Sequence, residues 1–383
     1  MPAPLPDTLT MLHRLIAAPS ISSATRSLDQ SNLTVIEHLH EWLEQLGFQT
    51  EVMHIPGHAG KANLIATLGT GPGGLVLAGH TDTVPCDPEL WRSDPFFLTE
   101  RDNRLYGLGT CDMKGFFPLA IEAARQFVDQ KLKQPLIILA TADEESSMSG
   151  ARALVEAGRP LARAAVVGEP TSLKPIRMHK GILMEGIRIQ GRSGHSSDPS
   201  LGANAMEAMH AAIGQLLQLR QELQQQYRNE QFAVSVPTLN LGCIHGGDSA
   251  NRICGSCELQ YDLRPLPGMT LDGLRNAIGE RLRPLSDRFG VQIETESLFP
   301  GIPPFETPAQ SELVRLSEKL TGHRAEAVAF GTEAPFLDAL GMDTIVLGPG
   351  SINQAHQPDE FLALDQIKPT VELLRSLIAH YCL

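Results

Sequence analysis

The chain has 383 residues, of which 42% are apolar and 20% charged, and its formal net charge is −13 at pH 7. This length favours two domains, and the composition is that of a globular protein with a sizeable core. The acidic balance disfavours binding to nucleic acid or to an anionic membrane surface. The first residues show no secretion signal, and no run approaches the roughly 20 apolar residues of a membrane span. We therefore expect a cytoplasmic protein whose cysteines are reduced.

The first part of the chain alternates helical and strand patterns, and the same style returns near the C-terminus. Helical spacing of apolar residues predicts the helices, and short apolar runs between them predict buried strands. This alternation is typical of an α/β sheet covered on both faces. In chain order, the predicted elements are helices over 9–18 and 32–46, strands over 63–67 and 75–79, a helix from about 113 to 128, a strand over 136–140, a helix over 150–156, a strand over 164–167, and later a helix over 310–320, a strand over 344–347 and a helix over 366–380.

The middle of the chain has a different pattern. Its elements follow the order β-α-β-β-α-β, which is typical of a ferredoxin-like α+β sandwich. We predict that residues 183–293 form this smaller domain, inserted into a large mixed-sheet α/β domain made of residues 1–182 and 294–383. The long Gln-rich helix of the insertion would face either solvent or a second subunit. The predicted elements are strands over 182–190, 238–244, 258–264 and 291–298, and helices over 204–227 and 271–285.

Candidate metal ligands follow four predicted strands of the large domain. Ligands collect at the carboxyl ends of strands in open α/β sheets, so these side chains are expected to converge. Imidazole and carboxylate ligands without cysteine suit zinc, cobalt or manganese in a catalytic site, and a bridging carboxylate would let them hold two ions. Any one of them alone would more often be a turn or cap residue. The candidates are His80 and Asp82 after LVLAG, Asp143, Glu144 and Glu145 after IILATA, Glu169 after AAVVG, His356 in the loop after TIVLG, and Asp112 in the Gly-rich turn of YGLGTCDMKG.

At these residues the sequence resembles the M20 family of zinc peptidases and deacylases. GHTDTVP, GLGTCDMKG, ATADEES, GEPTS and AHQPDE match its motifs in order and cover nearly the whole chain. The resemblance implies a metallohydrolase that cuts an acyl group from a small N-acyl amino acid. It also implies two Zn²⁺ per subunit, with Co²⁺ as an alternative, and a homodimer.

The resemblance also implies a role for each candidate. His80, Asp112 and Glu169 resemble the ligands of one zinc. Asp112, Glu145 and His356 resemble those of the other, with Asp112 bridging the two ions. Glu144 resembles the general base, and Asp82 resembles the acid that orients the imidazole of His80.

Further residues resemble parts of the family's substrate site. The inserted domain resembles a dimerisation domain, and His195 in RSGHSSDP resembles a histidine that reaches the partner subunit's active site. Four positions resemble contacts to the substrate, namely Asn251, Arg264, Thr332 and Lys180. As isolated residues, His195 would be a turn residue, and Asn251, Arg264 and Lys180 would be ordinary surface residues.

Two questions remain open at the level of sequence. The first is the substrate side chain, since a distal ammonium would need an acidic partner. Glu333 is a candidate, but it is as readily interpreted as a carboxylate at a helix start. The second is whether the chain is a non-catalytic metal-binding or dimeric scaffold on the same fold. Such a relative would be expected to lose the base or a ligand, and here Glu144 and all five ligand candidates are present.

Overall fold

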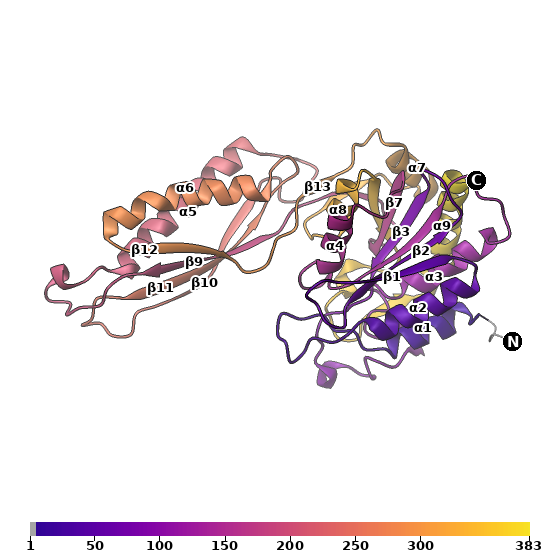
Figure 1. Ribbon diagram of the computed structural model, residues 1–383, viewed down its shortest axis with the longest axis horizontal. Coiled ribbons are helices and arrows are strands. Elements are labelled where there is room, and N and C mark those ends of the chain that lie inside the picture. The colour runs from indigo at the N-terminus through magenta and orange to yellow at the C-terminus, as the bar shows by residue number, and fades with distance from the viewer. Residues whose placement is uncertain (1–4) are drawn as a thin grey trace. The chain divides into compact units, whose positions relative to one another are not determined.

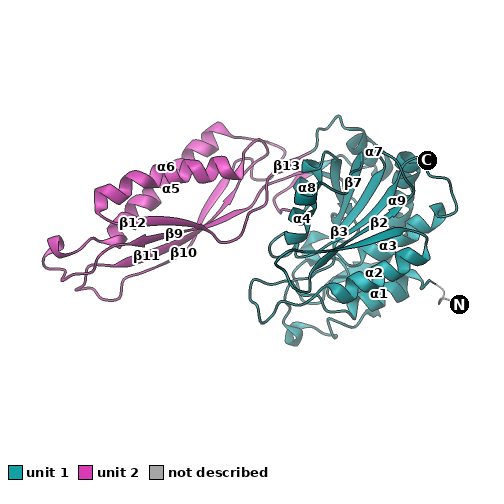
Figure 2. Cartoon of the chain, viewed as in Figure 1, with its two compact units in different colours: residues 1–177, 307–326, 332–383 teal, residues 178–306, 327–331 magenta. Residues whose placement is uncertain are grey.

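The computed structural model describes residues 5–383, which form two compact units (Figures 1 and 2). Of the described residues, unit 1 contains 5–177, 307–326 and 332–383, and unit 2 contains 178–306 and 327–331. Unit 2 extends beyond the predicted 183–293 at both ends. The reason is that main-chain pairing continues past the predicted strands. Ile182 pairs with Ile302, and Phe305 pairs with His179.

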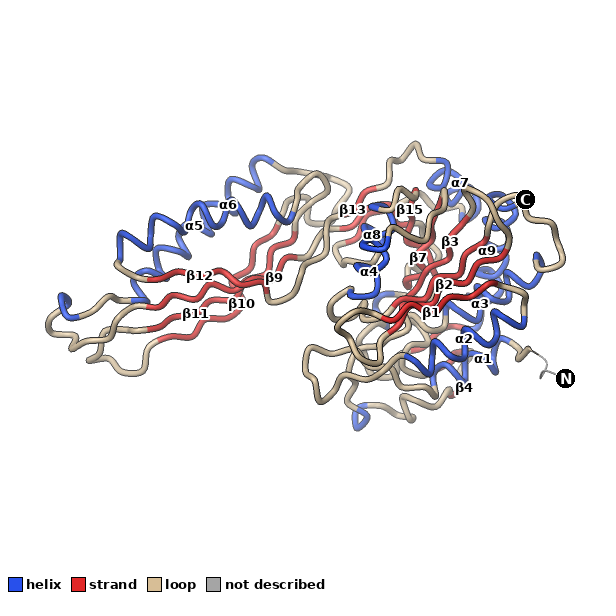
Figure 3. The backbone as a smooth tube through the Cα atoms, in the orientation of Figure 1, coloured by secondary structure: helices blue, strands red, loops and turns tan. Residues whose placement is uncertain are grey.

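Unit 1 is built on a large mixed sheet, which confirms the predicted fold class (Figure 3). The strand order is β1-β2-β6-β3-β7-β15-β8, and the chain passes into unit 2 within β8. Strands β6, β3, β7 and β15 are parallel, whereas β2 runs antiparallel to both β1 and β6. The strands are β1 Gln49–His54, β2 Ala62–Leu68, β3 Leu75–His80, β6 Leu136–Thr141, β7 Ala164–Pro170, β8 Ile176–His179 and β15 Asp343–Gly348.

The central strands are buried on both faces, as the uninterrupted apolar runs predict. Every residue of β3 is buried; Leu75 and Leu77 belong to the core that also contains side chains of α3 and α9, and Val76 and Ala78 alternate to the other face. The first helix begins at a cap in which the Asp7 carboxylate accepts from the N–H of Thr10. The helices are α1 Thr8–Ile16, α2 Leu33–Gln45, α3 Phe116–Ala124, α4 Ser149–Ala157, α7 Glu312–Thr321, α8 Ala334–Ala339 and α9 Ile367–Cys382.

A small second sheet in unit 1, of order β16-β5-β4, is not predicted by the sequence. Its strands are too short to show a period, and they are β4 Thr99–Arg101, β5 Arg104–Tyr106 and β16 Phe361–Ala363. Its register pairs Phe361 with Tyr106. The sheet therefore joins the segment after His356 to the segment before Asp112.

Unit 2 has the predicted β-α-β-β-α-β order, with sheet order β10-β11-β9-β12 and all neighbours antiparallel. Strand β9 has mainly alternating burial because its sheet is covered on one face. The elements are β9 Leu183–Gln190, α5 Ala205–Gln226, β10 Thr238–Gly246, β11 Ser256–Arg264, α6 Leu271–Phe289 and β12 Gln292–Ser297. Two short strands, β13 Phe305–Glu306 and β14 Glu326–Val328, pair with β8 of the large sheet. Between residues 5 and 383, no helix combines the length and the apolar character needed to cross a membrane.

Candidate metal centre

The parallel strands of unit 1 bring the candidate ligands to one edge of the sheet. His80 is the last residue of β3, and in the register it pairs with Thr141, the last residue of β6. Glu144 and Glu145 follow β6 directly, and Glu169 lies near the end of β7. His356 lies in the loop after β15. Since these strands are parallel, their carboxyl ends meet at the same edge.

Asp112 lies between the two imidazoles. Its Oδ1 is 3.1 Å from Nε2 of His80, and its Oδ2 is 3.6 Å from Nε2 of His356. Each oxygen of this one carboxylate thus faces a different histidine. This is the arrangement that a carboxylate shared by two metal ions requires.

Further carboxylates complete the two halves of the site. The Oε1 of Glu169 is 3.8 Å from Nε2 of His80, and the Oε2 of Glu145 is 3.0 Å from Nε2 of His356. Ligand atoms of His80, Asp112 and Glu145 all lie within 4.8 Å of one another, and so do those of His80, Glu144 and Glu169. Glu144, the expected base, therefore lies within 4.8 Å of the ligand atoms of His80 and Glu169.

The site holds more negative charge than its own residues compensate. Burial, together with neighbouring carboxylates, raises the pKa of Glu144 and that of Glu169 well above the usual range. Burial also raises the pKa of Glu145, reinforced by the negative charge of Asp112. Among the described residues, the cationic partners paired with these acids are the imidazoles of His80 and His356. Divalent cations would supply the missing positive charge, so the donor set and the charge balance both fit metal ions.

The contacts between carboxylates and imidazoles also shift the pKa values of His356 and Asp112. Hydrogen bonding to Glu145 raises the pKa of His356 to about 9. Although burial acts in the opposite direction, Asp112 has a lowered pKa because His80 and His356 flank it. A metal ion would replace protons on both imidazoles, because histidine ligates metals in its neutral form.

Asp82 holds the loop that carries the expected base. Its Oδ1 accepts from the main-chain N–H of Glu144 at 3.2 Å, and its Oδ2 accepts from that of Glu145 at 3.0 Å. The Nδ1 of His80 lies 3.0 Å from the main-chain oxygen of Asp82 and 3.7 Å from its carboxylate. The hydrogen bond that orients His80 is therefore made by the carbonyl of Asp82, not by the side chain that the sequence suggested.

Asp143 is engaged away from the ligand cluster. Its Oδ1 is 2.6 Å from the ammonium of buried Lys61 and accepts from the hydroxyl of Ser22 at 3.0 Å. Its Oδ2 accepts from the hydroxyl of Ser149 at 2.9 Å. This carboxylate anchors the loop after β6 to its surroundings, and it is not available as a ligand.

The residues expected to bind substrate are distributed over both units. Thr332 is in unit 1, is fully buried, and its hydroxyl accepts from the N–H of Ala334 at the start of α8. Lys180 is in unit 2, is 2% exposed, and donates to the carbonyl of Val236 at 2.7 Å. Both side chains therefore form hydrogen bonds with main-chain groups of the protein itself.

The other expected contacts lie in unit 2. Arg264 donates to the carboxylate of Asp262 at 2.8 Å, and the side chain of Asn251 accepts from the hydroxyl of Ser249. His195 is exposed, and its main chain pairs with Arg252. Its Nδ1 is 2.7 Å from the hydroxyl of Ser197, so a hydrogen bond to a substrate would come from Nε2.

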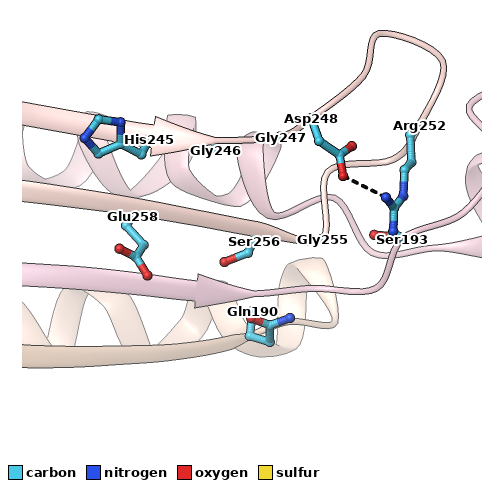
Figure 4. A pocket seen from close by; sticks show the side chains of 10 residues that line it. All are labelled: Gln190, Ser193, His245, Gly246, Gly247, Asp248, Arg252, Gly255, Ser256 and Glu258. Carbon is cyan, nitrogen blue, oxygen red and sulfur yellow. Dashed lines mark hydrogen bonds and ion pairs between the residues drawn. The ribbon is translucent and has the colours of Figure 1, made fainter.

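A polar pocket of about 430 Å³ lies beside this part of unit 2 (Figure 4). Its lining includes His245, Glu258 and Arg252, and Arg252 is paired with Asp248 at 2.7 Å. None of the five expected ligands lines it. One of the lining residues, Arg252, pairs through its main chain with His195.

Two further acids near the cluster are buried, namely Glu360, which the sequence did not single out, and Glu333, which it offered as a partner for a substrate ammonium. Glu360 accepts hydrogen bonds from the main chain of the turn that carries Asp112. Glu333, 1% exposed, lies 2.6 Å from the hydroxyl of Thr141, and its Oε1 has no hydrogen-bond partner among the described residues. Glu360 falls within the AHQPDE motif, but nothing in the pattern shows where its side chain points.

The fold and the cluster together define a candidate metal centre at the carboxyl edge of an α/β sheet. Solved structures share this fold over nearly their full length. A tripeptidase from Staphylococcus aureus has a TM-score of 0.73 and 18% identity, with 97% of this chain and 96% of that chain covered. A metallo-carboxypeptidase from Sulfolobus solfataricus has a TM-score of 0.73 and 18% identity, with 97% and 98% covered. The YXEP protein of Bacillus subtilis, described as a dinuclear metal-binding peptidase, has a TM-score of 0.65 and 16% identity, with 97% of both chains covered.

Residues 76–380 match peptidase family M20/M25/M40, and the chain belongs to this family. It is therefore an M20 family hydrolase, as the sequence motifs indicated. The structural likenesses, at 16–18% identity, establish the fold alone.

Proposed function

We propose that the protein is a two-metal amide hydrolase that removes the acetyl group from N2-acetyl-L-ornithine, giving L-ornithine and acetate in cytoplasmic arginine biosynthesis. The position of Asp112, with one oxygen toward each histidine, is the observation that carries the two-metal assignment. His80, Asp112 and Glu169 would hold one Zn²⁺, and Asp112, Glu145 and His356 the other, with Co²⁺ also suited to these ligands. Such ions polarise a carbonyl oxygen and lower the pKa of water.

Glu144 is the proposed general base. It would take a proton from the attacking water and return it to the departing amine. Burial and the neighbouring carboxylates raise the pKa of Glu144, whereas metal ions beside it would lower this pKa, so the two effects oppose each other on a group that must accept and then donate a proton. Asp82 fixes the main chain of Glu144 and so holds the base in place.

We further propose a homodimer in which His195 serves the active site of the partner subunit. Nε2 of its imidazole would donate to the oxygen on which negative charge develops. Unit 2 offers suitable surfaces for pairing. Strand β10 is an edge strand with exposed Ile244, and a groove of about 790 Å³ along α5 and α6 is lined partly by Ile213 and Leu217. Open edges and exposed apolar side chains of this kind favour association.

The substrate assignment is supported by motif resemblance. HTDTVP, EPTSLKPIRMHKG, GHSSDP, NRIC and LGPGSINQAHQPDE resemble those of bacterial acetylornithine deacetylases. A related N-acyl amino acid deacylase, such as succinyl-diaminopimelate desuccinylase, would share the chemistry and differ in its pocket. A succinyl group carries a distal carboxylate and needs a cationic partner, whereas ornithine carries a distal ammonium.

A substrate panel tests the proposal. Protein reconstituted with Zn²⁺ or Co²⁺ would be assayed on N2-acetyl-L-ornithine, succinyl-diaminopimelate, other N-acetyl amino acids and a tripeptide. We expect the highest kcat/KM on N2-acetyl-L-ornithine. Preference for succinyl-diaminopimelate or for the peptide would refute the substrate assignment. Absence of hydrolysis of every amide by metal-loaded protein would instead favour the non-catalytic scaffold.

A further inference from the structure

Glu360 is a buried acid that the proposed mechanism does not use. It is 1% exposed and follows His356 in the same loop. Its Oε1 accepts from the main-chain N–H of Cys111 at 2.7 Å and from that of Asp112 at 2.9 Å. The N–H of Gly109 lies 3.1 Å from each of its two oxygens. One carboxylate therefore accepts from three amides of this turn, whereas the remaining amide, that of Thr110, bonds to the carbonyl of Gly107.

This turn sets the position of Asp112. The Asp112 carboxylate faces His80 with one oxygen and His356 with the other, so a small shift of its main chain would disturb both halves of the site. A hydrogen bond from the Asp112 amide to Glu360 restrains that main chain directly.

Glu360 is itself held firmly. Its main-chain oxygen accepts from the N–H of Gly107 at 3.1 Å. The next residue, Phe361, begins β16 and pairs with Tyr106 in β5. The loop of His356 and the turn of Asp112 are thus tied by the main chain and by the Glu360 carboxylate, although they are far apart in sequence.

We propose that Glu360 is a positioning residue, which holds the Asp112 turn and the His356 loop in one frame and thereby sets the affinity for the pair of divalent metal ions. The inference rests on the proposed two-metal site. Residues that hold metal ligands in place typically contribute roughly 10- to 100-fold to metal affinity.

The chemistry of the three amides identifies the informative variant. All three groups are donors, and a carboxylate offers acceptors only. Glu360→Gln keeps the shape and one acceptor oxygen, but it places an NH2 group where Oε2 now accepts from the N–H of Gly109. Glu360→Ala removes every acceptor and leaves the amides of the turn without a partner.

In the experiment, Co²⁺ is titrated into metal-free full-length protein. Binding is measured by calorimetry and by the visible absorption of bound cobalt. Wild-type protein should bind two Co²⁺. Glu360→Gln should bind them about 10- to 100-fold more weakly, with an altered absorption spectrum, and Glu360→Ala at least as weakly. Should Glu360→Ala fail to fold, the near-isosteric Gln variant decides the question.

Glu185→Gln is the matched control. Glu185 is also a buried acid, but it lies in unit 2 and accepts from Arg275 and Ser297. This substitution should leave cobalt affinity and spectrum unchanged. Wild-type affinity and spectrum in a folded Glu360→Gln protein would overturn this inference alone. Wild-type protein that takes up no Co²⁺ would overturn the proposed function, and this inference with it.

Discussion

Replacing Glu333 by glutamine should stabilise the metal-free protein at alkaline pH and not at acidic pH. Burial raises the pKa of Glu333 from 4.5 to about 7, and the carboxyl is 1% exposed. An acid with a raised pKa holds its proton more tightly in the folded state. Between pH 4.5 and about 7 the folded protein therefore binds more protons than the unfolded chain, and its stability falls as the pH rises. Above this range, ionised Glu333 lowers the free energy of unfolding by the full amount, about 3 kcal/mol.

The measurement is urea unfolding of metal-free wild-type and Glu333→Gln protein at pH 5 and pH 8. The free-energy difference between the two proteins should change by about 3 kcal/mol in favour of the variant from the lower to the higher pH. Any constant offset from the amide cancels in this comparison. Glu294→Gln, at an exposed acid of β12, is the control and should show no such change. A pH-independent difference for Glu333→Gln would show that Glu333 has an ordinary pKa and would refute the reasoning.

Three further outcomes are expected. Glu144→Gln should keep its metal, measured by elemental analysis, while kcat falls by at least about 10²–10⁴, and exposed Glu156→Gln should retain full activity; an active Glu144→Gln enzyme would exclude Glu144 as the base. His195→Ala should lower kcat by roughly 10²–10³, and mixing it with Glu144→Gln should restore activity through hybrid dimers; if mixing restores nothing, the site is not shared between subunits. Zn²⁺ supplied at about 1,000 times its Kd should stabilise metal-free protein by about 4 kcal/mol for each ion bound, because it binds the folded state; an unchanged melting temperature would argue against a preformed metal site.

Much of the fold follows from local pattern. The apolar run before His80 predicts a strand buried on both faces, and β3 is such a strand. The β-α-β-β-α-β order of unit 2 is likewise visible in the spacing of apolar residues. By contrast, β1 is largely exposed and β4, β5 and β16 have three residues each, so their sequences carry too little periodicity to predict them.

The candidate site, like the fold, could be predicted from the sequence only in part. That His80, Glu145 and Glu169 meet at one edge could be expected from the sequence, because parallel strands align their carboxyl ends and each residue follows such a strand. The sequence itself does not show which atoms face one another. The carboxylate of Asp82 accepts a hydrogen bond from the main chain of Glu144, the expected base. Thr332 and Lys180 form hydrogen bonds with main-chain groups of the protein. All of these contacts depend on tertiary packing.

What the sequence alone determined, therefore, is the order of the elements and the chemical types gathered at the sheet edge, since periodicity and strand direction are local properties. Only the tertiary structure decided that one oxygen of Asp112 faces each histidine, and that the carboxylate of Glu360 holds the turn carrying it. Glu360 and Cys111 are separated by 249 positions along the chain. Hydrogen bonds over such a separation leave no periodic trace, because they arise when independently formed segments pack together.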